Sequence, residues 1–143
     1  MKTITRQSLS LEACMRMGEA AISMAREIKI EIAITIIDES GVPKAFFRMD
    51  HAPLVAVDAS RKKAITAVGL GIPSGDSYYE FIKDDPILLN GVQQFKDFIL
   101  LGGGSPIIAD GSVIGAIGIS GGHYKQDEQC IKAAIAAFNQ MDL

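Results

Sequence analysis

The order in which hydrophobic periodicity changes along this chain constrains its fold more than any other feature. Apolar residues recur every three to four positions in some segments, as in amphipathic helices, and every second position in others, as in half-buried strands. The pattern predicts helices at 8–28, 54–68 and 78–83, strands at 31–38, 44–49, 96–101, 105–109 and 112–119, and a last helix capped by Asp127. Helices and strands do not alternate strictly, which argues against a doubly wound parallel sheet. We therefore expect an α/β (α+β) fold with helices flanking a mainly antiparallel five-stranded sheet.

Length and charge narrow the class of protein. A chain of 143 residues is the size of one ordinary domain, so we expect a single domain over residues 1–143. The net charge of −3 lacks the basic surplus that nucleic-acid binding needs, and no stretch reaches the roughly 18 apolar residues of a membrane span. Residues 1–63 hold ten Lys/Arg and eight Asp/Glu, whereas residues 64–143 hold four and nine. This polarity predicts a homo-oligomer.

The two cysteines and the N-terminus indicate the compartment. The N-terminal segment has no continuous apolar stretch of the kind found in a signal peptide. Cys14 and Cys130 both lie in helical patterns, and a chain of this composition does not need a disulfide. We expect a cytoplasmic protein with two reduced, packed thiols.

Residues 118–122 match the G-x-S-x-G motif that places a nucleophilic serine between a strand and a helix. In that class of hydrolase, the acid and then the histidine follow the serine along the chain. Here His123 is the one histidine after Ser120, and it precedes Asp127, so the order fails. We predict that Ser120 is not a nucleophile and that the small residues turn the chain tightly.

Three consecutive glycines, Gly102, Gly103 and Gly104, precede Ser105-Pro106. A phosphate-binding P-loop would continue with Gly-Lys-Ser/Thr into a helix, so ATP binding is not supported. Two alternatives remain, since such a loop either lines a ligand pocket or only closes a hairpin. Gly115 and Gly118, inside a strand pattern, likewise indicate close approach of a ligand or of a neighbouring backbone.

Lys63 lies at the centre of a face of small residues on the helix predicted at 54–68, whereas Arg61 interrupts the apolar stripe of that helix. A lysine among small residues fits contact with a carboxylate of a ligand or of a second subunit. The alternative is an ordinary solvated face on which Arg61 extends its charged end into water. His51 and His123 belong to no zinc motif, which leaves isolated metal ligation and a plain surface position both open.

Four segments in register give the chain a family resemblance. They are Phe47-Arg48-Met49-Asp50, Arg61-Lys62-Lys63-Ala64-Ile65-Thr66-Ala67, Gly103-Gly104-Ser105-Pro106-Ile107, and Ile114 to Gly122 followed by Gln126-Asp127-Glu128. Together they resemble the GlcG/HbpS-like family, which includes the C-terminal domain of PduO-type proteins. The resemblance covers nearly the whole chain and implies a profilin-like α/β/α sandwich on an antiparallel sheet.

The resemblance also implies candidate functions. Relatives are described as haem-binding or haem-degrading, as companions of glycolate oxidation, or as domains attached to corrinoid adenosyltransferases. Some haem-binding relatives place a histidine in the first helix, where this chain has Cys14, Met15 and Met17, and His51 stands where many members have a small residue. The positions that match the family are Arg48, Asp50, Lys63, Thr66, the Gly102–Pro106 loop, Ser120 and Asp127.

These observations lead to one main hypothesis and two alternatives. The main one is a small-molecule binding protein for haem or a related carboxylate-bearing tetrapyrrole, held between the Lys63 helix face and the Gly102 loop at a subunit contact. The predicted ligand-binding residues are Arg48, Asp50, Lys63, Thr66, Gly102, Gly103, Gly104 and Ser120, with His51 and His123 as candidate metal ligands. The first alternative is an enzyme or accessory factor in small hydroxy-acid, diol or corrinoid metabolism, with Lys63 and Asp50 as acid/base candidates. The second is a ligand-free oligomeric structural partner.

Overall fold

A four-stranded antiparallel sheet forms the centre of the protein, for which a computed structural model describes residues 1–142. The strands are β1 (Ala33–Asp38), β2 (Pro43–Arg48), β3 (Gly104–Ala109) and β4 (Ser112–Ser120). They are arranged in the order β2-β1-β4-β3, so two hairpins meet through the pairing of β1 with β4. Asp110 and Gly111 connect β3 to β4 with positive φ angles at both positions, as a type I′ turn requires.

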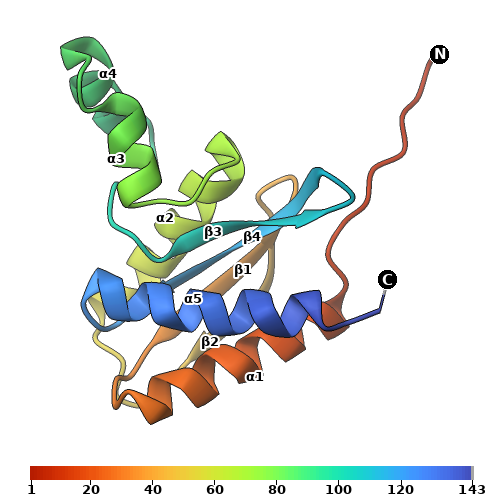
Figure 1. Ribbon diagram of the computed structural model, residues 1–143, viewed down its shortest axis with the longest axis vertical. Coiled ribbons are helices and arrows are strands. Elements are labelled where there is room, and N and C mark those ends of the chain that lie inside the picture. Colours follow the sequence, from red (N-terminus) through yellow and green to blue (C-terminus); the bar gives the residue numbers. More distant parts are fainter. Residues whose placement is uncertain (143) are drawn as a thin grey trace.

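Helices cover both faces of the sheet (Figure 1). α1 (Leu11–Glu27) and α5 (Tyr124–Asn139) pack side by side on one face, and α2 (Val55–Leu70) packs on the other, mainly against β4 and β1. Ser10 caps α1 by accepting a hydrogen bond from the amide of Ala13. The antiparallel sheet flanked by helices is therefore confirmed, with four strands in place of five.

The main hydrophobic core lies between the sheet and the α1–α5 pair. Alternate residues of β1 and β4 point into it, because successive side chains of a strand face opposite sides. Cys14 and Cys130 belong to this core as buried free thiols on neighbouring helices. None of the helices within residues 1–142 combines the length and apolar composition needed to cross a membrane.

The segment 96–101 is not a strand, which corrects the prediction. Its backbone is hydrogen-bonded to other partners: the amide of Ile99 donates to Thr66 Oγ1 at 2.8 Å, and the carbonyl of Leu100 accepts from the amide of Gly75 at 2.8 Å. Arg61 adds an ion pair with Asp97 at 2.9 Å. These contacts fix the segment across α2, and β3 is left as the edge of the sheet.

α2 faces the sheet mainly with its small residues, and only the start of its predicted apolar stripe is exposed, since Ala64 is buried and Ile65 and Val68 pack beside it. Ser60 and Ala67 are fully buried, whereas Leu54, just before the helix, is 84% exposed. The cause is the close approach of α2 to β4: a Cβ at Gly118 would overlap the carbonyl oxygen of Ser60. The space beside the small face of α2 is thus filled by the sheet, and a neighbouring backbone explains Gly118.

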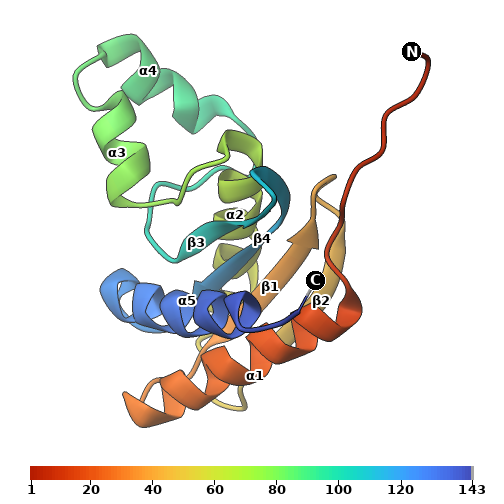
Figure 2. The same ribbon diagram turned by 45° about the vertical axis from the view of Figure 1, so that its right-hand side comes forward.

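Residues 76–94 form an arm of short helices that projects away from the sheet (Figures 1 and 2). The arm consists of α3 (Asp76–Ile82), α4 (Pro86–Gly91) and the 3-10 helix η1 (Val92–Gln94). The sequence predicted only the first of these. The signal for α4 was present, since Asp85 caps it by accepting hydrogen bonds from two amides and Pro86 occupies its first turn.

Candidate functional site

A cavity of about 450 Å³ opens between the start of β3 and α5. This volume lies in the range of small-molecule sites, roughly 300 to 1,000 Å³. Its lining residues are Pro73, Ser74, Gly103, Gly104, Ser105, Glu128, Ile131, Lys132, Ile135, Ala136 and Asn139. The cavity therefore combines one wall of backbone and small side chains with one wall of helix.

The backbone wall is fixed by hydrogen bonds on both sides. Ser74 Oγ accepts from the amide of Gly104 at 2.9 Å, and the amide of Ser74 donates to the Gly104 carbonyl at 3.1 Å. The Gly103 carbonyl accepts from the amide of Ile119 at 2.7 Å. The glycine loop is thus held in place before any ligand arrives, and the Gly104 amide is already used within the protein.

Directly beneath this wall lies a buried ion pair. Lys63 Nζ donates to Asp127 Oδ2 at 3.0 Å and to the Ile119 carbonyl at 2.9 Å, and Asp127 Oδ1 accepts from the amide of Gly122 at 3.0 Å. The two charged side chains are 2% and 1% exposed. Burial lowers the pKa of Lys63 and raises the pKa of Asp127, while their mutual attraction opposes both shifts.

The ion pair explains why a glycine stands above it. A Cβ at Gly103 would lie 3.0 Å from Lys63 Nζ and 3.1 Å from Asp127 Cβ, and the φ angle of Gly103 is +114°. The loop therefore packs against Lys63 and Asp127 with its inner side and lines the cavity with its outer side. Lys63 is not among the cavity lining residues, and its charge is satisfied within the protein by Asp127.

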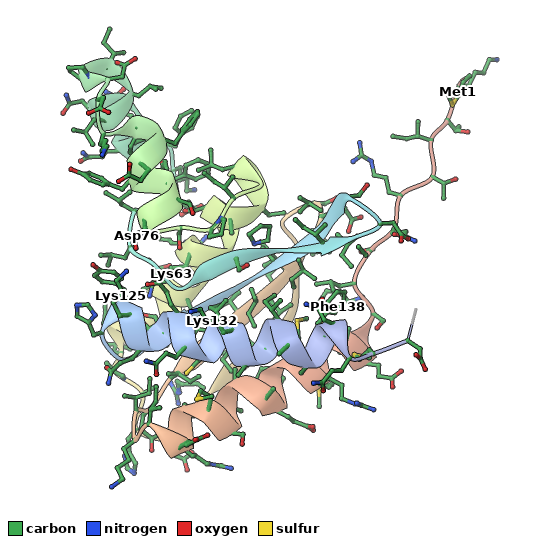
Figure 3. The ribbon with its side chains drawn as sticks, viewed as in Figure 1. Met1, Lys63, Asp76, Lys125, Lys132 and Phe138 are labelled. Atoms are coloured by element: carbon green, nitrogen blue, oxygen red, sulfur yellow. The ribbon has the colours of Figure 1, made fainter. Side chains whose placement is uncertain are left out.

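The helical wall comes from one side of α5. Ile131 and Ile135, four residues apart, form its apolar surface, and Lys132 stands beside them with its side chain exposed. Within residues 1–142, Lys132 makes no salt bridge. Lys63, Asp76 and Lys125 gather near the start of α5, and Lys132 lies farther along it (Figure 3). Lys132 is thus a free cation at the rim of an apolar wall.

Glu128 closes the end of the cavity nearest the start of α5. Its Oε1 is buried without a hydrogen-bond partner among the described residues, and the nearest cation is Lys125 Nζ at 3.6 Å. Lys125 also pairs with Asp76 at 2.6 Å. The carboxylate lies against Gly102, where an added Cβ would be 3.1 Å from Oε1. Glu128 therefore contacts the loop and adds negative charge at that end only.

The start of α5 differs from the prediction. His123, not Asp127, is the N-cap, because its Nδ1 accepts from the amide of Lys125 at 3.1 Å and Gln126 Oε1 accepts from the His123 amide at 3.0 Å. A neutral imidazole that accepts at Nδ1 carries its proton on Nε2. His123 is outside the cavity lining, and so is His51, which is exposed in the turn after β2.

The remaining predicted site residues are spread over the fold. Arg48 and Asp50 are exposed at the far edge of the sheet, at and just after the end of β2. Thr66 is buried and holds the 96–101 segment. Ser120 is 92% buried at the end of β4, and within residues 1–142 its hydroxyl makes no hydrogen bond to a histidine or a carboxylate.

The structure thus brings Lys63, Asp127 and the glycine loop together, and it leaves the other predicted residues apart. Among the described residues, no group of three His, Cys, Asp or Glu side chains could hold a metal ion. The cavity residues Ser74, Lys132 and Ile135 were not predicted as site residues. The spacing of Ile131 and Ile135 was visible, but only the fold places it beside the loop.

Comparison with known proteins places this architecture in a family. The family model described as "Haem degrading protein HbpS-like" matches residues 9–136. The chain is 31% identical over 136 residues to a 15.0 kDa protein of the dhaT–dhaS intergenic region of Citrobacter freundii, with 94% of each chain covered. It is 30% identical to the corrinoid adenosyltransferase PduO of Salmonella typhimurium over 140 residues, which are 96% of this chain and 41% of PduO.

One of the similar solved structures is a complex with a ligand. The crystal structure of a PduOC:haem complex superposes with a TM-score of 0.83 and 30% sequence identity, covering 91% of this chain and 94% of that one. The predicted resemblance is therefore confirmed at the level of sequence and of fold.

Proposed function

The chain belongs to the HbpS-like family of haem-degrading proteins, and from that premise we propose that it binds haem or a related carboxylate-bearing tetrapyrrole in the cavity between β3 and α5. The observation that carries the proposal is the lining of this cavity, in which an apolar helical wall faces a preformed glycine loop and a free lysine stands at the rim. The existence of a PduOC:haem complex supports the ligand class.

The residues of the cavity fit the organic part of such a ligand. Ile131 and Ile135 offer an apolar surface to a flat ring, and Gly103 and Gly104 let that ring approach the backbone closely. Lys132 is placed to pair with a carboxylate. Haem would bring a redox-active iron to the cavity, whereas the part played by the protein is to bind, orient and partly desolvate the ring.

The cavity lining contains no histidine, cysteine or methionine. The binding energy that this chain provides must therefore come from apolar contacts with the ring and from ionic contacts with its carboxylates. His51 and His123 lie outside the lining, so the proposal assigns them no contact with the ligand.

A haemin titration tests the proposal. Lys132→Ala should weaken haemin binding about three- to tenfold at moderate salt, because a partly exposed charged hydrogen bond contributes on the order of 1 kcal/mol. Ile135→Ser should weaken it further by removing apolar contact. Lys62→Ala is the matched control, since Lys62 is on α2, pairs with Asp58 and is not among the cavity lining residues, so this variant should bind like the wild type. Equal affinities for all four proteins would overturn the assignment of this cavity.

The similarity to PduO favours a second candidate, an accessory role in corrinoid metabolism, because the match covers 96% of this chain. Titration with cobalamin separates the two. Corrinoids carry amide side chains where haem carries carboxylates, so Lys132→Ala should leave cobalamin binding unchanged. If neither ligand binds, the ligand-free structural role becomes the better explanation.

We also propose that the protein is a homo-oligomer. Large apolar side chains are exposed on α2 and on the arm, among them Val55 at 72% and Phe81 at 67%. Exposed apolar groups of this size that gather on one part of a surface, as on the arm, are typical of contact surfaces. Sedimentation at micromolar concentration tests this, and a clean monomer would contradict it.

A further inference from the structure

The first eight residues form an extended strap that contacts little of its own chain. All eight are exposed and have no helical or strand structure, and Leu9 is the first buried residue. The strap is attached only at its base, where Gln7 donates to Asp110 at 3.1 Å and Ser8 donates to Glu39. Both ribbon views show it running away from the body of the protein (Figures 1 and 2).

A second feature is an uncovered apolar groove beside the arm. It has a volume of about 460 Å³ and lies between the arm and the segment that follows it. Its lining residues are Tyr78, Ile82, Leu89, Val92, Gln93, Phe98, Ile99, Leu100 and Leu101. Two of its apolar side chains are exposed, Leu100 at 38% and Leu101 at 51%. A groove of this kind leaves apolar surface in water unless another segment covers it.

The charges of the two features are opposite. Residues 1–11 carry Lys2 and Arg6 with no acidic residue, a formal side-chain charge of +2. Residues 76–97 carry five acidic residues and two lysines, a formal charge of −3. Within the described residues, three of these acids pair with cations of their own chain, whereas Asp84 makes no salt bridge. Opposite charges of this size favour association and fix its register.

We propose that the strap of one copy lies in the groove of a second copy. The strap is extended, its residue Ile4 is 66% exposed, and six residues reach about 20 Å from its base. Ile4 is the apolar side chain that would enter the groove, while Lys2 and Arg6 lie beside Asp84. The strap of the same chain runs away from the arm in both views, so a second copy is the occupant. This contact rests on the proposed homo-oligomer and specifies one of its interfaces.

Disulfide trapping between two differently substituted chains tests the contact. One chain carries Ile4→Cys and the other Gln93→Cys, at an exposed position in the groove lining. The native thiols do not interfere, because Cys14 and Cys130 are buried and burial raises the pKa of Cys130 to about 11. Mild oxidation of the mixture should give a linked heterodimer. The matched control replaces Gln93→Cys with Ser112→Cys, exposed at the β3–β4 turn, and should give at least threefold less product.

Charge substitutions in the two chains used for trapping test whether their opposite charges guide the contact. Lys2→Asp with Arg6→Asp should reduce the linked product at least threefold, and Asp84→Lys in the partner should restore part of it. Equal yields at Gln93→Cys and Ser112→Cys would overturn the proposed contact. If sedimentation shows an oligomer but trapping fails, the strap contact is wrong and the oligomer stands. A monomer would overturn both.

Discussion

Lys63 is a residue that the sequence marks as unusual and that only the structure explains. The sequence marks it as unusual, because a charged side chain stands among Ala, Ser and Thr on one helix face. The structure explains the anomaly through Asp127, 64 residues away, which neutralises it in the interior. The pair joins α2, the end of β4 and the start of α5 beneath the glycine loop. It is therefore a positioning pair for the cavity wall.

Removal of one partner should be much more costly than removal of both. Lys63→Met leaves a buried carboxylate without its cation and should lower the free energy of unfolding by about 3–5 kcal/mol. The double variant Lys63→Met/Asp127→Asn should recover at least half of that loss, since an amide still accepts from the Gly122 amide. Urea unfolding of the two variants measures the difference. Lys62→Met, on the same helix with an exposed partner, should change stability by less than about 1 kcal/mol.

If the single and double variants lose the same stability, the interaction between the two side chains contributes nothing, and the glycine loop must be held by its own hydrogen bonds. Haemin titration of the double variant then shows whether the cavity wall survives.

Among the elements, α2 lies so close to β4 that the contact depends on a glycine. Gly118→Ala should destabilise the protein by about 1–3 kcal/mol, because the new methyl group meets the carbonyl of Ser60 and the helix must move off the sheet. Gly91→Ala is the matched control, since an added Cβ there meets no atom within 4 Å and its φ of −69° suits any residue. It should be neutral or stabilising. Thermal unfolding compares the two, and equal melting temperatures would contradict the close contact.

The elements that sequence predicted well are those with strong local signals. The β1–β2 and β3–β4 hairpins and α1 follow from alternation, turn residues and the Ser10 cap. The segment 96–101 has equally strand-like composition, but its Ile99 amide donates to Thr66 and its Leu100 carbonyl accepts from Gly75, a tertiary effect that local propensity does not contain. The start of α5 was misplaced because Asp is a common cap, and only the fold shows that Asp127 is needed by Lys63.

The site was less predictable than the fold for the same reason. The glycine loop and Lys63 were identified, yet the wall opposite the loop is α5, a helix in which no ligand-binding residue was predicted. Ile135 and Lys132 lie at the border between core and surface of that helix. A border position has no signature in periodicity, so a cavity there appears only once β3 and α5 are placed together.

On the scale of the whole molecule, the cavity between β3 and α5 is separate from the apolar groove beside the arm. No residue lines both, and the cavity lining comes from residues 73–139 of one chain. We therefore expect haemin affinity to be independent of assembly. The variant Lys2→Asp/Arg6→Asp, designed to release the strap, should bind haemin within about twofold of the wild type, because less than about 0.4 kcal/mol should be transmitted between the sites. Titrations at protein concentrations below and above the assembly midpoint measure this. Affinity that rises with wild-type concentration, and is lost in the strap variant, would mean that a second copy completes the cavity at a subunit contact.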